Sequence, residues 1–179
     1  KTETEVWNGT NWTEVNDMNT GRRRGGGFGI ATAAINAGGS DSEGNDIAIA
    51  EYYNGTNWTE VNDLNTAGTV DGSGAGEYTA GLIAGRSASP SAQTESWNGT
   101  NWTEVNDLNT GRRALAGIGT QTSALAAGGA TLRSIVEEWN GTNWTEVADL
   151  NTGTEAAGDG GTTTSAIVAG GGQAARYIG

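Results

Sequence analysis

The chain has 179 residues, with 9 basic and 21 acidic side chains, no histidine and no cysteine. Disulfides, thiol nucleophiles, Cys/His zinc sites and histidine general bases are therefore excluded. The net charge of −12 opposes binding to a phosphate backbone. The sequence has no run of about 18 apolar residues of the kind that predicts a membrane span. We expect no nucleic-acid partner and no membrane insertion.

A repeated motif dominates the sequence. The string Asn-Gly-Thr-Asn-Trp-Thr-Glu-Val begins at Asn8 and recurs at Asn54, Asn98 and Asn140, at intervals of 46, 44 and 42 residues. The interval from Asn140 through the C-terminus and round to Asn8 is 47 residues, so the four intervals are nearly equal. This arithmetic is typical of a ring of repeats opened at one point.

In chain order, the predicted elements begin with a hairpin in which Thr4–Trp7 pairs with Trp12–Val15 across an Asn-Gly turn. Each following repeat predicts four short strands, as at 115–120, 123–127, 134–139 and 144–147. The C-terminal residues 162–169 supply only a first and a second strand before Gly170 and Gly171. Four strands in about 45 residues is the size of a propeller blade.

Aromatic side chains occupy two fixed places in every repeat. One closes the third strand and a tryptophan opens the fourth: Trp7, Tyr53, Trp97 and Trp139 are of the first kind, and Trp12, Trp58, Trp102 and Trp144 of the second. Each ring can bury about 150–250 Å², so we expect these eight side chains to form the core. The abundant glycine and alanine would then pack the first two strands closely near the axis of the ring.

At this point the residues resemble the kelch repeat, in which a glycine pair ends one strand and an aromatic residue, a tryptophan and an arginine follow. Here the pattern reads Gly128-Gly129, Trp139 and Trp144, with Arg112 and Arg113 preceding them. The likeness covers all four repeats, which also look like arrays in marine bacterial and phage proteins. It implies a β-propeller that serves as a binding scaffold rather than an enzyme.

The chain departs from the kelch pattern in three ways. The aromatic residue and the tryptophan are five apart, as at Tyr53 and Trp58, which implies a tighter hairpin. The second repeat has Ala84-Gly85-Arg86 in place of the glycine pair. Four blades is the small end of the family's range. The copper-dependent oxidase branch of the fold needs Cys and His, and their absence excludes that activity.

We therefore predict one all-β domain over residues 1–179, a four-bladed β-propeller with four antiparallel strands in each blade. The half-blades at the two ends are expected to meet in a composite blade that closes a monomeric ring and removes exposed strand edges. The alternative is a fragment of a longer array, whose split blade pairs with another molecule. A dimer of this kind would form an eight-bladed ring.

Arginines mark the loop that enters the first strand of alternate repeats. Arg22, Arg23 and Arg24 lie there in the first repeat and Arg112 and Arg113 in the third, whereas the second and fourth repeats carry acidic residues instead. Guanidinium groups facing each other across the axis can bind a carboxylate or an acidic sugar. The alternative is that these arginines pair with neighbouring Asp and Glu and hold the blades together. Arg22, Arg23, Arg112 and Arg113 are thus candidate ligand-binding residues.

Acidic side chains recur at equivalent positions in all four repeats. These positions are Glu5, Glu51, Glu95 and Glu137; Glu14, Glu60, Glu104 and Glu146; and Asp17, Asp63, Asp107 and Asp149. Paired carboxylates can hydrolyse a glycoside when they are held about 5–9.5 Å apart. Because identical placement in every blade argues for a structural role, we expect exposed cross-strand pairing for the glutamates and turn capping for the aspartates.

Other candidates occur only once. Tyr78 and Tyr177 lie outside the repeated aromatic positions and are candidates for contact with a glycan. The segment 41–46 has the oxygen ligands of a calcium loop without its spacing, so we interpret it as a solvated loop. We predict no metal site, no catalytic residue and no cofactor.

The expected function is that of a non-catalytic binding or structural propeller: an adhesin, a lectin-like module or a virion surface component, located extracellularly or on a virion. Its partner would be a glycan or another protein surface. The first alternative is a small lyase or hydrolase that acts on carbohydrate with Asp and Glu alone. The second is a purely architectural module.

Overall fold

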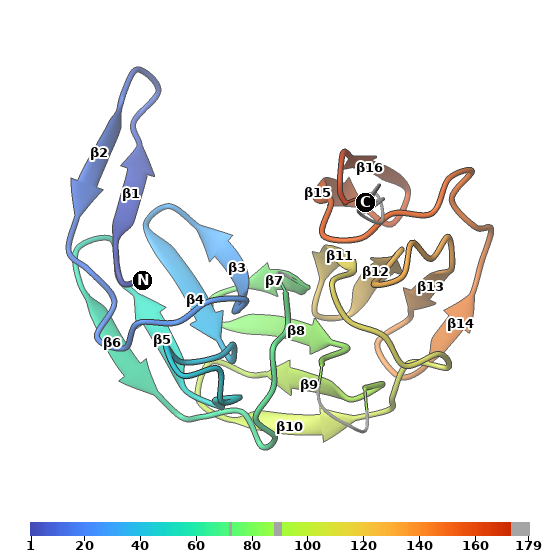
Figure 1. The fold of residues 1–179 in the computed structure, drawn as a ribbon, viewed down its shortest axis with the longest axis horizontal. Helices are drawn as coiled ribbons and strands as arrows, with labels where there is room; N and C mark the ends of the chain where they lie inside the picture. The colour runs from blue at the N-terminus through green and yellow to red at the C-terminus, as the bar shows by residue number, and fades with distance from the viewer. Residues whose placement is uncertain (72, 88–90, 173–179) are drawn as a thin grey trace, which may run out of the picture.

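A computed structural model of the chain describes residues 1–71, 73–87 and 91–172. In this part of the chain there are sixteen strands and no helix. Three four-stranded antiparallel sheets follow one another along an arc, and a two-stranded hairpin lies at each end (Figure 1). The all-β class and the four-stranded repeat unit are as predicted.

The first sheet comprises β3 (Gly26–Ile30), β4 (Ala33–Ala37), β5 (Ala50–Tyr53) and β6 (Trp58–Val61). The second comprises β7 (Gly74–Glu77), β8 (Ala80–Ala84), β9 (Thr94–Trp97) and β10 (Trp102–Val105). The third comprises β11 (Ala116–Thr120), β12 (Ser123–Ala127), β13 (Val136–Trp139) and β14 (Trp144–Glu146). We call these sheets the first, second and third blades.

Most predicted strands agree with the observed ones to within one or two residues. The exception is the first strand of the C-terminal half-blade, which was expected within 162–169 and lies at Gly158–Thr162. The third strand of the third blade begins at Val136 rather than at Ser134. Backbone N–H groups of Leu150 and Val147 bond to Ser134 and Val136, so the segment before β13 pairs with the loop that follows β14. An aromatic residue ends the third strand and a tryptophan begins the fourth in every blade, as predicted.

Strand order within each blade is meandering, from the axis outward. The first strands β3, β7 and β11 are neighbours around the axis, and β15 continues the series. They approach so closely that a Cβ atom on Gly74 would lie 2.5 Å from the carbonyl oxygen of Gly27, and one on Gly117 would lie 2.9 Å from the backbone nitrogen of Gly74. Glycine is therefore required on these inner strands, which confirms the expected role of small residues near the axis.

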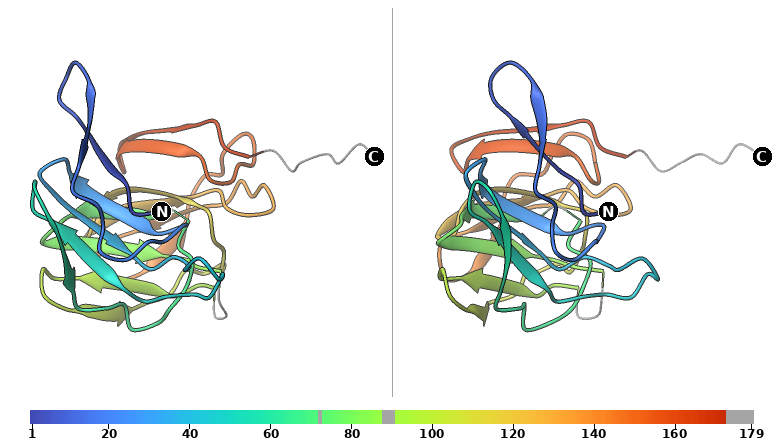
Figure 2. Two further views of the ribbon diagram at one scale, coloured as in Figure 1. Left: turned by 60° about the vertical axis from the view of Figure 1, so that its left-hand side comes forward. Right: turned by 90° about the vertical axis from the view of Figure 1, so that its left-hand side faces the viewer.

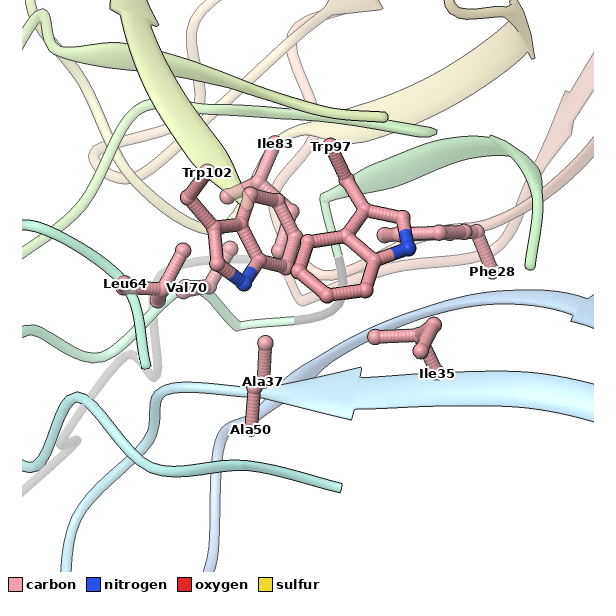
Figure 3. Close-up of a cluster of buried hydrophobic side chains, with 9 residues drawn as sticks. All are labelled: Phe28, Ile35, Ala37, Ala50, Leu64, Val70, Ile83, Trp97 and Trp102. Atoms are coloured by element: carbon pink, nitrogen blue, oxygen red, sulfur yellow. The ribbon is translucent and has the colours of Figure 1, made fainter. Parts of the chain in front are cut away.

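The hydrophobic cores lie between adjacent blades. Trp97 and Trp102 of the second blade pack against Phe28 and Ile35 of the first (Figure 3). A second cluster repeats this arrangement one blade further on, where Trp139 and Trp144 face the second blade. The paired rings have centroids 5.1–5.3 Å apart in the three blades and are tilted by about 40°. The aromatic core is thus an inter-blade structure, so each blade depends on its neighbour.

Each end of the chain carries half a blade. At the N-terminus β1 (Thr4–Trp7) pairs only with β2 (Trp12–Val15), and at the C-terminus β15 (Gly158–Thr162) pairs only with β16 (Ser165–Ala169). The two hairpins lie on the same side of the arc, with a gap between them (Figures 1 and 2). Among the described residues no sheet joins the two hairpins, so the blades are arranged in an arc and closure of the predicted ring stays a prediction.

The open ends leave two of the eight core aromatic rings in solvent. Trp7 and Trp12 are 48% and 65% exposed, whereas their counterparts Trp139 and Trp144 in the third blade are 2% and 6% exposed. Their burial requires a neighbouring sheet, which the N-terminal hairpin lacks on one side. The predicted core position is therefore confirmed in the second and third blades and for Tyr53 of the first, whereas Trp58 is half-buried and the N-terminal pair is exposed.

Candidate functional site

Each complete blade contains a buried carboxylate. Glu51, Glu95 and Glu137 lie at the second position of the third strand and are at most 1% exposed. They do not pair across the strands in solvent, so that expectation is wrong for this position. The cause is the two-residue alternation of a strand, which turns these side chains toward the incoming loop instead. The facing glutamates Glu60, Glu104 and Glu146 are exposed, as expected.

The loop that enters a blade surrounds this carboxylate with donors. In the third blade, Glu137 Oε2 accepts hydrogen bonds from the backbone N–H and side-chain amide of Asn109 at 2.7 and 2.8 Å, and Oε1 accepts one from Thr110 N–H at 3.2 Å. Arg112 completes the site with an ion pair to Oε1. Asn19 and Thr20 serve Glu51 in the same way, and Asn65 and Thr66 serve Glu95.

Electrostatics agree with this geometry. Burial by itself raises the pKa of Glu137, but hydrogen bonds from Arg112 and from both N–H groups of Asn109, together with the positive charge of Arg112, bring it below its usual value of 4.5. The carboxylate is therefore held in its charged form and contributes to stability as an ion.

The arginine of the second blade comes from a different position in the repeat. Arg22 and Arg112 belong to the incoming loop, where the second repeat has Gly68. Arg86 instead follows β8, at the place of the second glycine of the pair, and its Nη2 lies 2.9 Å from Glu95 Oε1. A Cβ atom on Gly68 would lie 3.1 Å from Arg86 Cδ, and one on Gly129 would lie 3.0 Å from Arg112 Cδ. The two positions therefore fill one volume, with arginine at one and glycine at the other.

The candidate ligand-binding arginines separate into two groups. Arg22 and Arg112 have side chains 1% exposed and are engaged by Glu51 and Glu137, which favours the structural alternative for both. Arg23 and Arg113 are accessible: Arg23 Nε donates to Ser40 Oγ at 3.2 Å, and Arg113 is 42% exposed.

Two arginines of the basic loops, Arg24 and Arg113, contact an acidic residue between blades. Asp71, in the loop that enters the second blade, lies 3.5 Å from Arg24 and 3.4 Å from Arg113. Arg24 belongs to the first repeat and Arg113 to the third, so Asp71 joins the two basic loops. The alternation of basic and acidic repeats seen in the sequence is thus used for contacts between blades.

The candidate tyrosines differ in what the structure describes. Tyr78 is 40% exposed and stacks on Tyr52 of the first blade, with ring centroids 5.2 Å apart and an interplanar angle of 23°. One face of the Tyr78 ring is therefore covered by Tyr52, and the rest of the side chain is accessible. Tyr177 lies outside the described residues.

One carboxylate at the axis was not singled out by sequence reasoning. Asp159 of β15 stands where the other inner strands have Gly27, Gly74 and Gly117. Desolvation by neighbouring atoms raises its pKa, and the backbone amide of Gly117 acts in the opposite direction. Alignment of the glycines in the first strands would have revealed it, because it is the sole charged residue at that position.

Three grooves border the terminal half-blades. One of about 430 Å³ is lined by 150–154 together with Val168 and 170–172, and includes Asn151 and Thr152. A second, of about 410 Å³, lies between the third blade and β16 and is lined by Val136, Val147 and Val168 among others. A third, also of about 410 Å³, lies between the N-terminal hairpin and the first blade and contains Trp7 and Trp12.

Residues 1–71, 73–87 and 91–172 contain neither a metal-binding cluster nor a membrane-spanning helix. No three His, Cys, Asp or Glu side chains come together there in an arrangement that could hold a metal ion. In segment 41–46, Asp41 Oδ1 accepts hydrogen bonds from Glu43 N–H and Asn45 N–H, which agrees with a simple solvated turn. Over the same described stretches, no helix has the length and apolarity needed to cross a membrane.

Comparison of this chain with models of known protein families and with curated proteins found no match to either.

Proposed function

We propose that the chain is a non-catalytic propeller module that binds or organises other molecules at a cell or virion surface. The observation that carries this proposal is the use of the repeated charged residues. Glu51, Glu95 and Glu137 are each engaged by an arginine and by backbone N–H groups of the incoming loop. Carboxylates held in this way stabilise contacts within and between blades. Their oxygens are already engaged, so they are not free to exchange a proton with a substrate as a general acid or base.

The proposed module is a closed four-bladed ring of kelch type. In it, β15–β16 supplies the inner half of a composite blade and β1–β2 supplies the outer half, as the complementary halves at the two ends suggest. A mass measurement in solution tests closure: a monomer of 18.2 kDa is expected, whereas a stable dimer would indicate an eight-bladed ring formed by two chains.

The proposed ligand is a glycan or a protein surface, and the accessible candidates are Tyr78, stacked on Tyr52, with Arg23 and Arg113. Equivalent blades suit weak contacts made several times, because linked weak sites bind together with greater avidity. Glycan arrays with the intact chain test this, with Tyr78→Ala and Arg113→Gln as binding variants and Arg133→Gln as the matched control. Unchanged binding by the first two variants would remove these residues from the site.

The alternative function is a carbohydrate lyase or hydrolase that acts with Asp and Glu alone, for which Asp159 on the inner strand β15 is the best candidate acid, because desolvation raises its pKa. A reducing-sugar assay on the same glycans separates the two functions. Binding without turnover supports the first proposal, and turnover that Asp159→Asn abolishes supports the enzyme.

A further inference from the structure

The C-terminal half-blade contains an empty copy of the carboxylate site. Asn151 and Thr152 follow the fourth strand of the third blade as Asn109 and Thr110 follow that of the second. In the three complete blades these two residues give their N–H groups to a glutamate of the third strand. Within the residues that the structure describes, no third strand follows β16, and the groove of about 430 Å³ is lined in part by Asn151 and Thr152.

The N-terminal hairpin carries the matching glutamate. Glu5 occupies the second position of β1, as Glu137 does in β13, but it is exposed. The register of the hairpin is also the same: Glu5 faces Glu14 and Trp7 faces Trp12, as Glu137 faces Glu146 and Trp139 faces Trp144. One chain thus contains both the glutamate, Glu5, and the loop at Asn151 and Thr152 that would bind it, although the two are not in contact.

We infer that the loop at Asn151 and Thr152 is a binding site for the carboxylate of Glu5, filled by the chain's own β1–β2 hairpin. This inference deepens the proposed ring closure and rests on it, since it specifies which residues make the junction. The occupant is the chain's own hairpin because it lies on the same side of the arc and is tethered at high effective concentration (Figure 2).

The register of the junction follows from the complete blades. In the third blade Trp139, Glu138, Glu137 and Val136 lie opposite Ala124, Leu125, Ala126 and Ala127. The same offset places Trp7 opposite Ala166, Val6 opposite Ile167, Glu5 opposite Val168 and Thr4 opposite Ala169. Each of these pairs joins a side chain from the N-terminal hairpin to one from β16.

Pairing in this register satisfies groups that the open arc leaves unpaired. The indole N–H groups of Trp97 and Trp139 donate to the carbonyl oxygens of Tyr78 and Gln121, in the turn between the first two strands of their blades. The equivalent acceptor for Trp7 is the carbonyl oxygen of Thr163. Trp7 and Ile167, whose side chains are exposed in the arc, would then lie on neighbouring paired strands of one sheet.

A disulfide tests the register directly, because the chain has no cysteine of its own. Residues directly opposite in antiparallel strands have Cα atoms about 4.5–5.5 Å apart, within the range that a disulfide spans. We expect Val6→Cys with Ile167→Cys to give an intramolecular disulfide under mild oxidation, seen as a faster monomer band on a non-reducing gel. The matched control is Val6→Cys with Val168→Cys, whose side chains lie on opposite faces, and it should cross-link at least tenfold more slowly.

Each other outcome contradicts the inference. Disulfide-linked dimers from the first pair would show that a second copy fills the site, and equal rates for both pairs would show that the register is wrong. Failure of glycan binding would leave these results unchanged, so loss of the proposed function and loss of the junction can be told apart.

Amide hydrogen exchange on the unmodified chain tests the carboxylate site itself. The N–H groups of Asn151 and Thr152 should be protected like those of Asn109 and Thr110, which serve as the internal reference. We expect Glu5→Gln to reduce their protection at least tenfold, whereas Glu14→Gln, on the facing strand, leaves it unchanged. Rapid exchange at Asn151 and Thr152 in the unmodified chain would overturn the inference.

Discussion

The third blade and the two terminal half-blades are built from nearly the same repeat, yet their glutamates have opposite environments. Glu137 is buried among four donors and paired with Arg112, whereas Glu5 is exposed beside its own hairpin. The residues Thr-Glu-x-Trp and Asn-Thr therefore do not create the site by themselves. A third strand must lie beside a second strand before the incoming loop can reach its carboxylate.

The proposed junction also lacks an ion pair and hydrogen bonds that the complete blades have. Neither position that supplies arginine elsewhere does so here, because Thr154 stands at the loop position and Gly171 in the glycine pair. Asn16, Asn62 and Asn106 each donate their side-chain amide to the Asn-Gly hairpin of the next blade, but Ala148 takes their place before the junction. The closing blade would therefore be the weakest of the four, and the first to separate.

Four changes break or sharpen this comparison. The largest effect is expected when an internal blade is made to resemble the junction. Arg86→Gly leaves Glu95 buried without its ion pair, which should cost about 3–5 kcal/mol of unfolding free energy. Adding Gly68→Arg to this variant should recover most of the loss, because the new guanidinium fills the volume that Arg86 vacated. Urea unfolding of the single and double variants measures both; a double variant no more stable than the single one would contradict the shared volume.

Acid should weaken the carboxylate site of the third blade, because Glu137 stabilises the fold in its charged form. The pKa of Glu137 is lower in the folded chain than its usual 4.5, so its contribution is complete above pH 4.5 and is lost as the pH falls through the folded value. Thermal melts between pH 7 and pH 3 should show a steeper loss of stability for the unmodified chain than for Glu137→Gln. The exposed-site control Glu146→Gln should follow the unmodified chain.

The reverse change makes the junction resemble an internal blade. Thr154→Arg places a guanidinium where Arg112 lies in the third blade, and in the closed ring it would reach Glu5. A charged hydrogen bond contributes about 1.5–3 kcal/mol, so we expect a gain of that order in urea unfolding. The gain should vanish when Glu5→Gln is added, and a gain that persists would show that the arginine acts elsewhere.

The smallest effect is expected from Ala148→Asn. Its amide would donate to Thr10 and Asn11 of the N-terminal hairpin, as Asn106 donates to Thr142 and Asn143. We expect about 0.5–1.5 kcal/mol of added stability, read from the shift in the urea midpoint. Because position 148 follows the strand and its side chain is exposed, an unchanged midpoint would mean that the hairpin does not dock there.

Much of this fold could be predicted from the sequence because the repeat carries strong local signals. The Asn-Gly turns and the fixed tryptophans placed the predicted outer hairpins to within two residues. The burial of Glu51, Glu95 and Glu137 could not be predicted in the same way, because strand alternation does not say which face meets the incoming loop. The proposed closure is likewise beyond local patterns, since it would depend on contact between the two ends of the chain.

The source of the arginine that pairs with each buried glutamate can be predicted from the sequence when two observations are combined. The second repeat lacks an arginine in its incoming loop, and it alone has an arginine in the glycine pair. Each observation alone is an irregularity. Together they predict that both positions face one carboxylate, which the contacts of Gly68 and Gly129 confirm.

This exchange of arginine and glycine restricts how such repeats can recombine. A crossover between the first and second repeats that falls between Gly68 and Arg86 would join the loop of one to the hairpin of the other. One product would crowd two guanidinium groups into a single space, and the other would bury a carboxylate with no counter-ion. Gene shuffling within this array should therefore preserve whole loop-and-hairpin units, so that each unit is inherited with its own counter-charge.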